Sequence, residues 1–183
     1  KYCKAEGFDS VWKQEVEVPR WLRGETETVR IEGENAMDLS AASLGNSIGT
    51  PDGGITAPVI EVFSLEEVDS LGRAGVEGKI VFYNRPFDNK QLRTFNAYGG
   101  AVDQRVYGPE KAAEYGALAA VVRSMTGRID DHPHTGVTRY RDKKKQAPGI
   151  AISTLDADLL SEKLKQNPEL ELFIEMDCHN EDP

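Results

Sequence analysis

Continuous apolar runs in the second half of the chain predict strands that are buried on both faces. These runs cover residues 79–83, 117–122 and 148–152. Residues 108–116 form a short helical pattern between the first two runs, with proline at the first helical position and glycine past the end. A second helix, at 154–166, begins with a Ser/Thr cap. Because short helices connect them, we expect the three strands to pair in parallel in one sheet.

The first half of the chain instead alternates apolar and polar residues, which is typical of half-buried strands. Strands are predicted for residues 11–18, 28–31 and 55–63, and a weaker one for residues 36–44. Within 11–18, the last three residues alternate. The same alternation returns at 170–176. The predicted fold class is therefore α/β and β-rich, with helices over less than a third of the chain.

The apolar positions of these elements predict the core. We expect the following side chains to be mostly buried: Ile80, Val81, Phe82, Leu118, Val121, Val122, Ile150, Ile152, Leu160 and Phe173.

The length of 183 residues fits one domain, and 39% hydrophobic with 29% charged residues is a globular composition. With 22 Lys and Arg against 31 Asp and Glu, the net charge is −9. This charge argues against nonspecific binding to nucleic acid or to an anionic membrane. No apolar run is long enough to span a bilayer.

Cys3 and Cys178 are either one disulfide, if the chain ends meet, or two unrelated thiols.

Candidate chemistry gathers in a long segment without periodicity, residues 124–147, because loops of that length are usually functional or mobile. It contains the cluster Asp130, Asp131, His132 and His134, the one set of side chains with metal-ligand character. The alternative is a polar loop whose histidines only bond the backbone, and the absence of a third nearby histidine favours it.

Other patterns indicate structure rather than catalysis. The chain has no Gly-x-Ser-x-Gly elbow, and its glycine-rich segment 45–54 lacks the lysine of a phosphate loop, so we interpret it as a tight structural loop. The basic run 139–145 is interpreted as a solvated loop. Core packing is expected for Trp12 and Trp21, with an exposed interface role as the alternative for Trp21.

Six strings in fixed order carry a resemblance: VPRWLRGE (18–25), LGNSIGTP (44–51), GITA (54–57), GKIVFYNRPF (78–87), AAEYGAL (112–118) and PHTG (133–136). This ordered set resembles the carboxypeptidase Q family of secreted zinc-dependent exopeptidases, related to plasma glutamate carboxypeptidase. The likeness runs from about residue 12 to the last predicted strand. The connection 88–107 is longer than the family pattern, which leaves the path between strand and helix undetermined.

The resemblance implies a protease-associated domain, with a swivelling β/β/α fold and an open sheet crossed by short helices. Residues 9–177 would form this domain with its lead-in strands, and 1–8 and 178–183 would be linkers to a parent metallopeptidase. The zinc-ligand motifs of the family would follow residue 183. The segment itself is then expected to be noncatalytic, with no cofactor and no metal ligand, while the parent peptidase domain binds zinc.

The implied function is an accessory lid that shapes substrate access or assembly. Its partners would be the parent peptidase domain in cis and a peptide substrate, with a homodimer as a further option and without nucleic acid or membrane. Its location would be secreted or periplasmic. The candidate contact residues for substrate or peptidase are Asn84, Arg85, His134, Thr135 and Gly136. The alternatives are that His134 only supports its loop and that Arg85 pairs with surface acids.

Two other functions stay open from the sequence. One is a self-standing protein-binding or sorting module, because protease-associated domains also occur in receptors. The weaker one is a small metal-dependent hydrolase that uses the cluster at residues 130–134.

Overall fold

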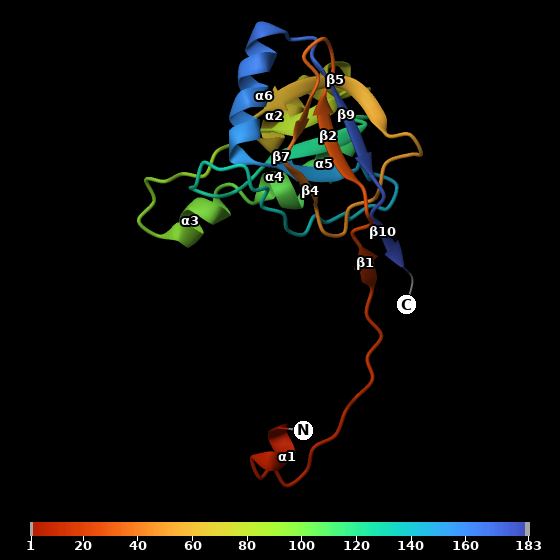
Figure 1. The fold of residues 1–183 in the computed structure, drawn as a ribbon, viewed down its shortest axis with the longest axis vertical. Helices are drawn as coiled ribbons and strands as arrows, with labels where there is room; N and C mark the ends of the chain where they lie inside the picture. Colours follow the sequence, from red (N-terminus) through yellow and green to blue (C-terminus); the bar gives the residue numbers. More distant parts are fainter. Residues whose placement is uncertain (1, 182–183) are drawn as a thin grey trace.

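Eight strands form one strongly curved sheet in the computed structural model, which describes residues 2–181 (Figure 1). The order across the sheet is β3-β2-β9-β5-β6-β7-β8-β4. The bounds are β2 Glu27–Ile31, β3 Met37–Leu39, β4 Ala41–Ser43, β5 Ile55–Val62, β6 Ile80–Tyr83, β7 Ala119–Arg123, β8 Gly149–Ile152 and β9 Glu171–Met176. Strands β5 to β8 are parallel, as predicted for the last three, and the remaining pairings are antiparallel.

The curvature brings the two ends of the sheet together. The carboxylate of Glu27 on β2 accepts a hydrogen bond of 2.7 Å from the backbone N–H of Ser43 on β4. The sheet is therefore nearly closed, although β2 and β4 do not pair as strands.

The helices are α1 (Tyr2–Ala5), α2 (Leu65–Val76), α3 (Thr94–Gly99), α4 (Asp103–Val106), α5 (Gly108–Glu114) and α6 (Thr154–Gln166). The last two match the prediction, and Ser153 caps α6 by accepting from the N–H of Asp156 at 3.0 Å. Helix α2 was not predicted from the sequence, although Ser64 caps it by accepting from the N–H of Glu67 at 3.2 Å, and the Glu67 carboxylate accepts from the N–H of Phe63 at 2.7 Å. None of the helices in residues 2–181 is long and apolar enough to cross a membrane.

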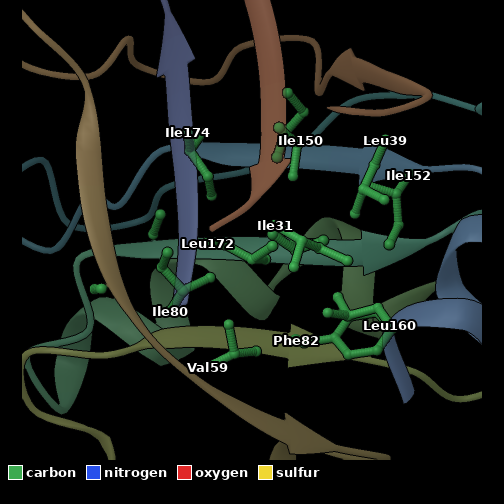
Figure 2. Packing of buried hydrophobic residues seen from close by; sticks show 14 of the residues in the cluster. Ile31, Leu39, Val59, Ile80, Phe82, Ile150, Ile152, Leu160, Leu172 and Ile174 are labelled. Carbon is green, nitrogen blue, oxygen red and sulfur yellow. The ribbon is translucent and has the colours of Figure 1, made fainter. Parts of the chain in front are cut away.

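Strands β6, β7 and β8 are buried on both faces, which explains their continuous apolar runs. Ile80 and Phe82 point into the interior of the curved sheet, where α6 contributes Leu160, and Figure 2 shows these side chains meeting others from strands around the sheet. Val81 and Tyr83 point outward and pack under α2 and α5.

The predicted core is confirmed with two exceptions. Leu118 is 42% exposed because it lies one residue before β7 begins. Phe173 is only half-buried, since it alternates with Leu172 and Ile174, which face the core. The remaining predicted core residues are at most 1% exposed.

The chain enters and leaves the body through a two-stranded ribbon of β1 (Arg20–Leu22) and β10 (His179–Glu181), which pair antiparallel. The prediction of a strand at residues 11–18 is wrong, because this segment leads away from the body without pairing (Figure 1). Trp12 is 78% exposed and so does not pack in the core. Trp21 does pack against the core, and its Nε1 donates to the carbonyl of Ser47 at 2.9 Å.

The two thiols are free in the structure. Cys178 is buried in the core, and Cys3 is exposed on α1. The disulfide alternative is therefore not realised.

Candidate functional site

The candidate residues lie where β6 and β7 end. Because these neighbouring strands are parallel, the loops that follow them leave the same edge of the sheet. Asn84 and Arg85 follow β6, and the loop after β7 contains His134, Thr135 and Gly136. The backbone N–H of His134 donates to Oγ of Ser124 at 2.7 Å. Because Ser124 lies at the end of β7, this hydrogen bond holds the loop against the edge of the sheet.

Asn84 is the centre of a partly buried hydrogen-bonded network that links β5, β6, β7 and α6. Its Nδ2 donates to Oε1 of Glu61 on β5 at 2.6 Å. Its Oδ1 accepts from Nη1 of Arg123 on β7 at 3.1 Å, and the same Nη1 donates to Oδ1 of Asp158 on α6 at 2.6 Å. Asn84 is only 6% exposed, so its amide is used inside the domain.

Arg85 is tied to α4. Its guanidinium forms an ion pair with Asp103, and its backbone N–H and carbonyl bond to the side-chain amide of Gln104 at 3.1 and 2.9 Å. Gln104 is completely buried. The charge of Arg85 therefore already has a partner within the chain, in agreement with the alternative that it pairs with an acid.

His134 differs from the two residues after it. Thr135 donates from Oγ1 to the carbonyl of Ser43 at 2.5 Å, and the carbonyl of Gly136 accepts from the N–H of Gly45 at 2.9 Å. The guanidinium of Arg105 covers Gly136 so closely that a Cβ there would lie 2.5 Å from its Cζ. Thr135 and Gly136 thus anchor the loop to the body, and the His134 ring is exposed.

The acidic and histidine cluster is spread over the surface of this loop. Asp131 and His132 pair with each other at 2.8 Å, with both side chains at least 70% exposed. The carboxylate of Asp130 accepts from the backbone N–H of His132 at 3.3 Å. Within residues 2–181, no three His, Cys, Asp or Glu side chains are grouped closely enough to hold a metal ion.

A cavity of about 520 Å³ lies between the loop after β6 and the loop after β7. Its apolar lining includes Phe87, Phe95, Tyr98 and Met125, and its polar lining includes Arg128 and His134. Of these six residues, only His134 is among the contact residues predicted from the sequence. The unusual length of connection 88–107 pointed to Phe95 and Tyr98, and the long segment 124–147 without periodicity contains Met125 and Arg128.

Known proteins resemble this chain, although no family model matches it. Carboxypeptidase Q of Bos taurus is 37% identical over 158 residues, which are 86% of this chain and 31% of that protein. Carboxypeptidase Q of Xenopus laevis is 34% identical over 180 residues, 98% of this chain and 36% of that protein. The chain thus spans about a third of the length of these relatives.

Solved structures agree. A peptidase M28 precursor from Shewanella amazonensis superposes with a TM-score of 0.88 and 30% identity, over 98% of this chain and 40% of that one. An aminopeptidase from an Aneurinibacillus strain, at 16% identity and a TM-score of 0.61, shares the fold. The chain is homologous to one segment of carboxypeptidase Q and has the fold of the corresponding part of a peptidase M28 precursor.

Proposed function

We propose that the chain is the noncatalytic protease-associated domain of a zinc exopeptidase, in which it shapes the access of peptide substrates to the catalytic site. The observation that carries the proposal is the extent of the match. Identity of 34–37% covers 86–98% of this chain, yet only 31–36% of relatives that are named carboxypeptidases. The zinc and the catalytic groups would then belong to the parent peptidase domain.

The ribbon of β1 and β10 supports this arrangement. Its antiparallel pairing brings the entry and exit of the domain body side by side, as insertion of a domain into a host requires. An ion pair of 3.2 Å between Arg20 and Glu181 also links the two strands. The parent peptidase domain would meet the body at this ribbon, in a secreted or periplasmic protein.

We infer different roles for the candidate residues from their contacts at the sheet edge. Asn84 and Arg85 are held by Glu61, Arg123 and Asp103, so we propose that they fix the shape of the edge. His134 is exposed on a loop whose backbone is anchored, and we propose that it is the group that faces the substrate or the peptidase.

Kinetics of the full-length parent test this function. His134→Ala should lower kcat/KM for peptides several-fold, with unchanged zinc content, because it removes a substrate contact outside the metal site. His132→Ala is the matched control, since its ring is exposed two residues away in the same loop. Wild-type kinetics for His134→Ala would refute the substrate role. A transmembrane segment instead of a peptidase in the adjoining parent sequence would favour the sorting-module alternative.

A further inference from the structure

We propose that the cavity beside the ribbon of β1 and β10 is a docking site for a carboxylate-bearing loop of the parent peptidase domain, and that Lys143 receives the carboxylate. The inference rests on the proposed function in one respect, which is that a parent domain continues from the ribbon. It goes beyond that function because it names the surface that holds the domain against its parent.

The cavity lies where the ribbon joins the body. Its volume is about 610 Å³, and its lining includes Pro19, directly before β1, and all three residues of β10. The body contributes residues of the glycine-rich segment 45–54, and Tyr140, Lys143 and Gln146. Figure 1 shows β1 and β10 leaving the body at one end. A parent domain that continues from both strands therefore starts beside this cavity.

The basic segment 139–145 has a charge opposite to that of the chain. Its five Lys and Arg residues and one Asp give a net charge of +4, whereas the whole chain carries −9. Two of the five cations are occupied within the domain. Lys145 pairs with Glu114 at 3.3 Å, and the Arg141 guanidinium lies over the Tyr107 ring, with Cζ 4.6 Å from the ring centroid. Positive charge therefore remains on this segment for an anionic partner.

The unused charge in the cavity lining is also positive. Among residues 2–181, no ion pair or hydrogen bond involves the ammonium group of Lys143. Within the same residues, Glu181 is the one carboxylate of the lining, and it is already paired with Arg20 at 3.2 Å. The side-chain amides of Gln146 and Asn180 add hydrogen-bond donors to the lining. A carboxylate only accepts hydrogen bonds, so it fits a lining that offers a cation and further donors.

The cavity offers apolar surface next to these donors. Ile48 is half-buried and Pro19 is exposed, and both belong to the lining. The aliphatic stem of a glutamate would cover such surface, which is favourable by about 25 cal/mol per Å². At about 610 Å³ the cavity has room for this side chain and part of its loop, since sites of about 300–1,000 Å³ enclose whole small molecules.

The test measures by mass spectrometry how fast acetic anhydride acylates individual lysines in the 183-residue chain and in the full-length parent. A domain in cis acts at an effective concentration of about 1 mM, so a contact with a Kd of about 0.1 mM is formed for about nine-tenths of the time. Lys143 should therefore react about tenfold more slowly in the parent than in the chain alone. Equal rates would overturn the proposal. Protection in the chain alone that grows with its concentration would overturn it too, because that result assigns the cavity to a second copy.

Lys165 is the control lysine for this comparison. Its side chain is 68% exposed on α6, in the part of the body away from the ribbon (Figure 1), so its rate should be the same in both proteins. If Lys165 slowed by the same factor as Lys143, the protection would not be specific to the cavity and the proposal would fail.

Charge reversal at Lys143 separates docking from simple proximity to the ribbon. His179 lines the same cavity and is exposed, so its reaction with diethyl pyrocarbonate reports whether the cavity is covered. Lys143→Glu should raise the rate at His179 in the parent to the rate in the chain alone. Lys144→Glu, which changes the neighbouring exposed lysine outside the lining, should keep His179 protected. Equal melting temperatures of the two variant chains verify folding, and a His179 that stays protected in Lys143→Glu would contradict the role of Lys143.

These measurements fail independently of the proposed function. If Lys143 is not protected in the parent while His134→Ala still impairs peptide hydrolysis, the docking proposal fails and the accessory function stands. If Lys143 is protected as expected but His134→Ala leaves the kinetics unchanged, the substrate role fails and the cavity remains the docking site.

Discussion

Gly24 occupies a turn that only glycine fits well. Its φ is +79°, and a Cβ on it would overlap the carboxylate of Asp177. That carboxylate accepts hydrogen bonds from the backbone N–H groups of Glu25 at 3.0 Å and Thr26 at 2.8 Å, which lower the pKa of Asp177. Because Gly24 has no side chain, Asp177, directly after β9, can hydrogen-bond the backbone just before β2.

Replacing Gly24 by alanine should therefore combine backbone strain with the loss of these hydrogen bonds. Gly53→Ala is the matched control, because its φ of +84° is similar and nothing lies within 4 Å of the added Cβ. We expect Gly53→Ala to cost about 1 kcal/mol of unfolding free energy and Gly24→Ala about 2–3 kcal/mol in urea denaturation. Equal losses would mean that the Asp177 contact contributes nothing.

At the scale of elements, β6 stabilises two packing layers at once. Ile80 belongs to the interior cluster and Val81 to the layer under α2 and α5, and both are completely buried. A strand of four residues can do this only in the middle of the sheet, where other elements cover both of its faces.

Alanine substitutions on either face of β6 should consequently be costly. Ile80→Ala should lower the unfolding free energy by about 2–4 kcal/mol, and Val81→Ala by a smaller amount that still exceeds about 1 kcal/mol. Leu118→Ala, at a 42% exposed site beside the same sheet, should cost less than about 1 kcal/mol. Chemical denaturation measures all three, and a neutral effect at Val81 would contradict the outer layer.

At the scale of the molecule, the buried Tyr83 and the half-buried Tyr140 each bond a backbone carbonyl of a distant or neighbouring segment. The Tyr83 hydroxyl donates to the carbonyl of Gly108 at 2.9 Å, and the Tyr140 hydroxyl donates to that of Ala147 at 2.6 Å. Burial raises the pKa of both phenols, that of Tyr140 to about 12. The folded state therefore favours the protonated form of both.

This linkage predicts how the stability of the whole molecule responds to alkali. An unfolded tyrosine releases its proton near pH 10, so the stability that Tyr140 contributes is complete below that pH and is lost as the pH rises toward 12. Tyr140→Phe should reduce the fall in melting temperature between pH 9.5 and about 11.5. Tyr2→Phe, at an 84% exposed site, should leave the fall unchanged. An identical fall in Tyr140→Phe and the unaltered chain would contradict this role of Tyr140.

Local patterns were enough to predict five central elements of the second half of the fold. Continuous apolar runs, a proline at a helix start and a serine cap are local signals, and they located β6, β7, β8, α5 and α6. They also predicted that the loops after parallel strands leave one edge, because parallel pairing follows from short helical connections. The same reasoning failed at residues 11–18, where an alternating pattern has no neighbouring strand with which to pair.

Only the tertiary structure decided which partners each candidate residue has. Arg85 and His134 are both polar in the sequence, but Arg85 pairs with Asp103, which comes from a segment without a periodic signal. His134 is exposed instead. The cavity likewise combines α3 with the loop after β7, some thirty residues apart. Burial and charge pairing depend on which distant segments meet, so the sequence alone determined the strands and the shared edge, and long-range packing determined the site.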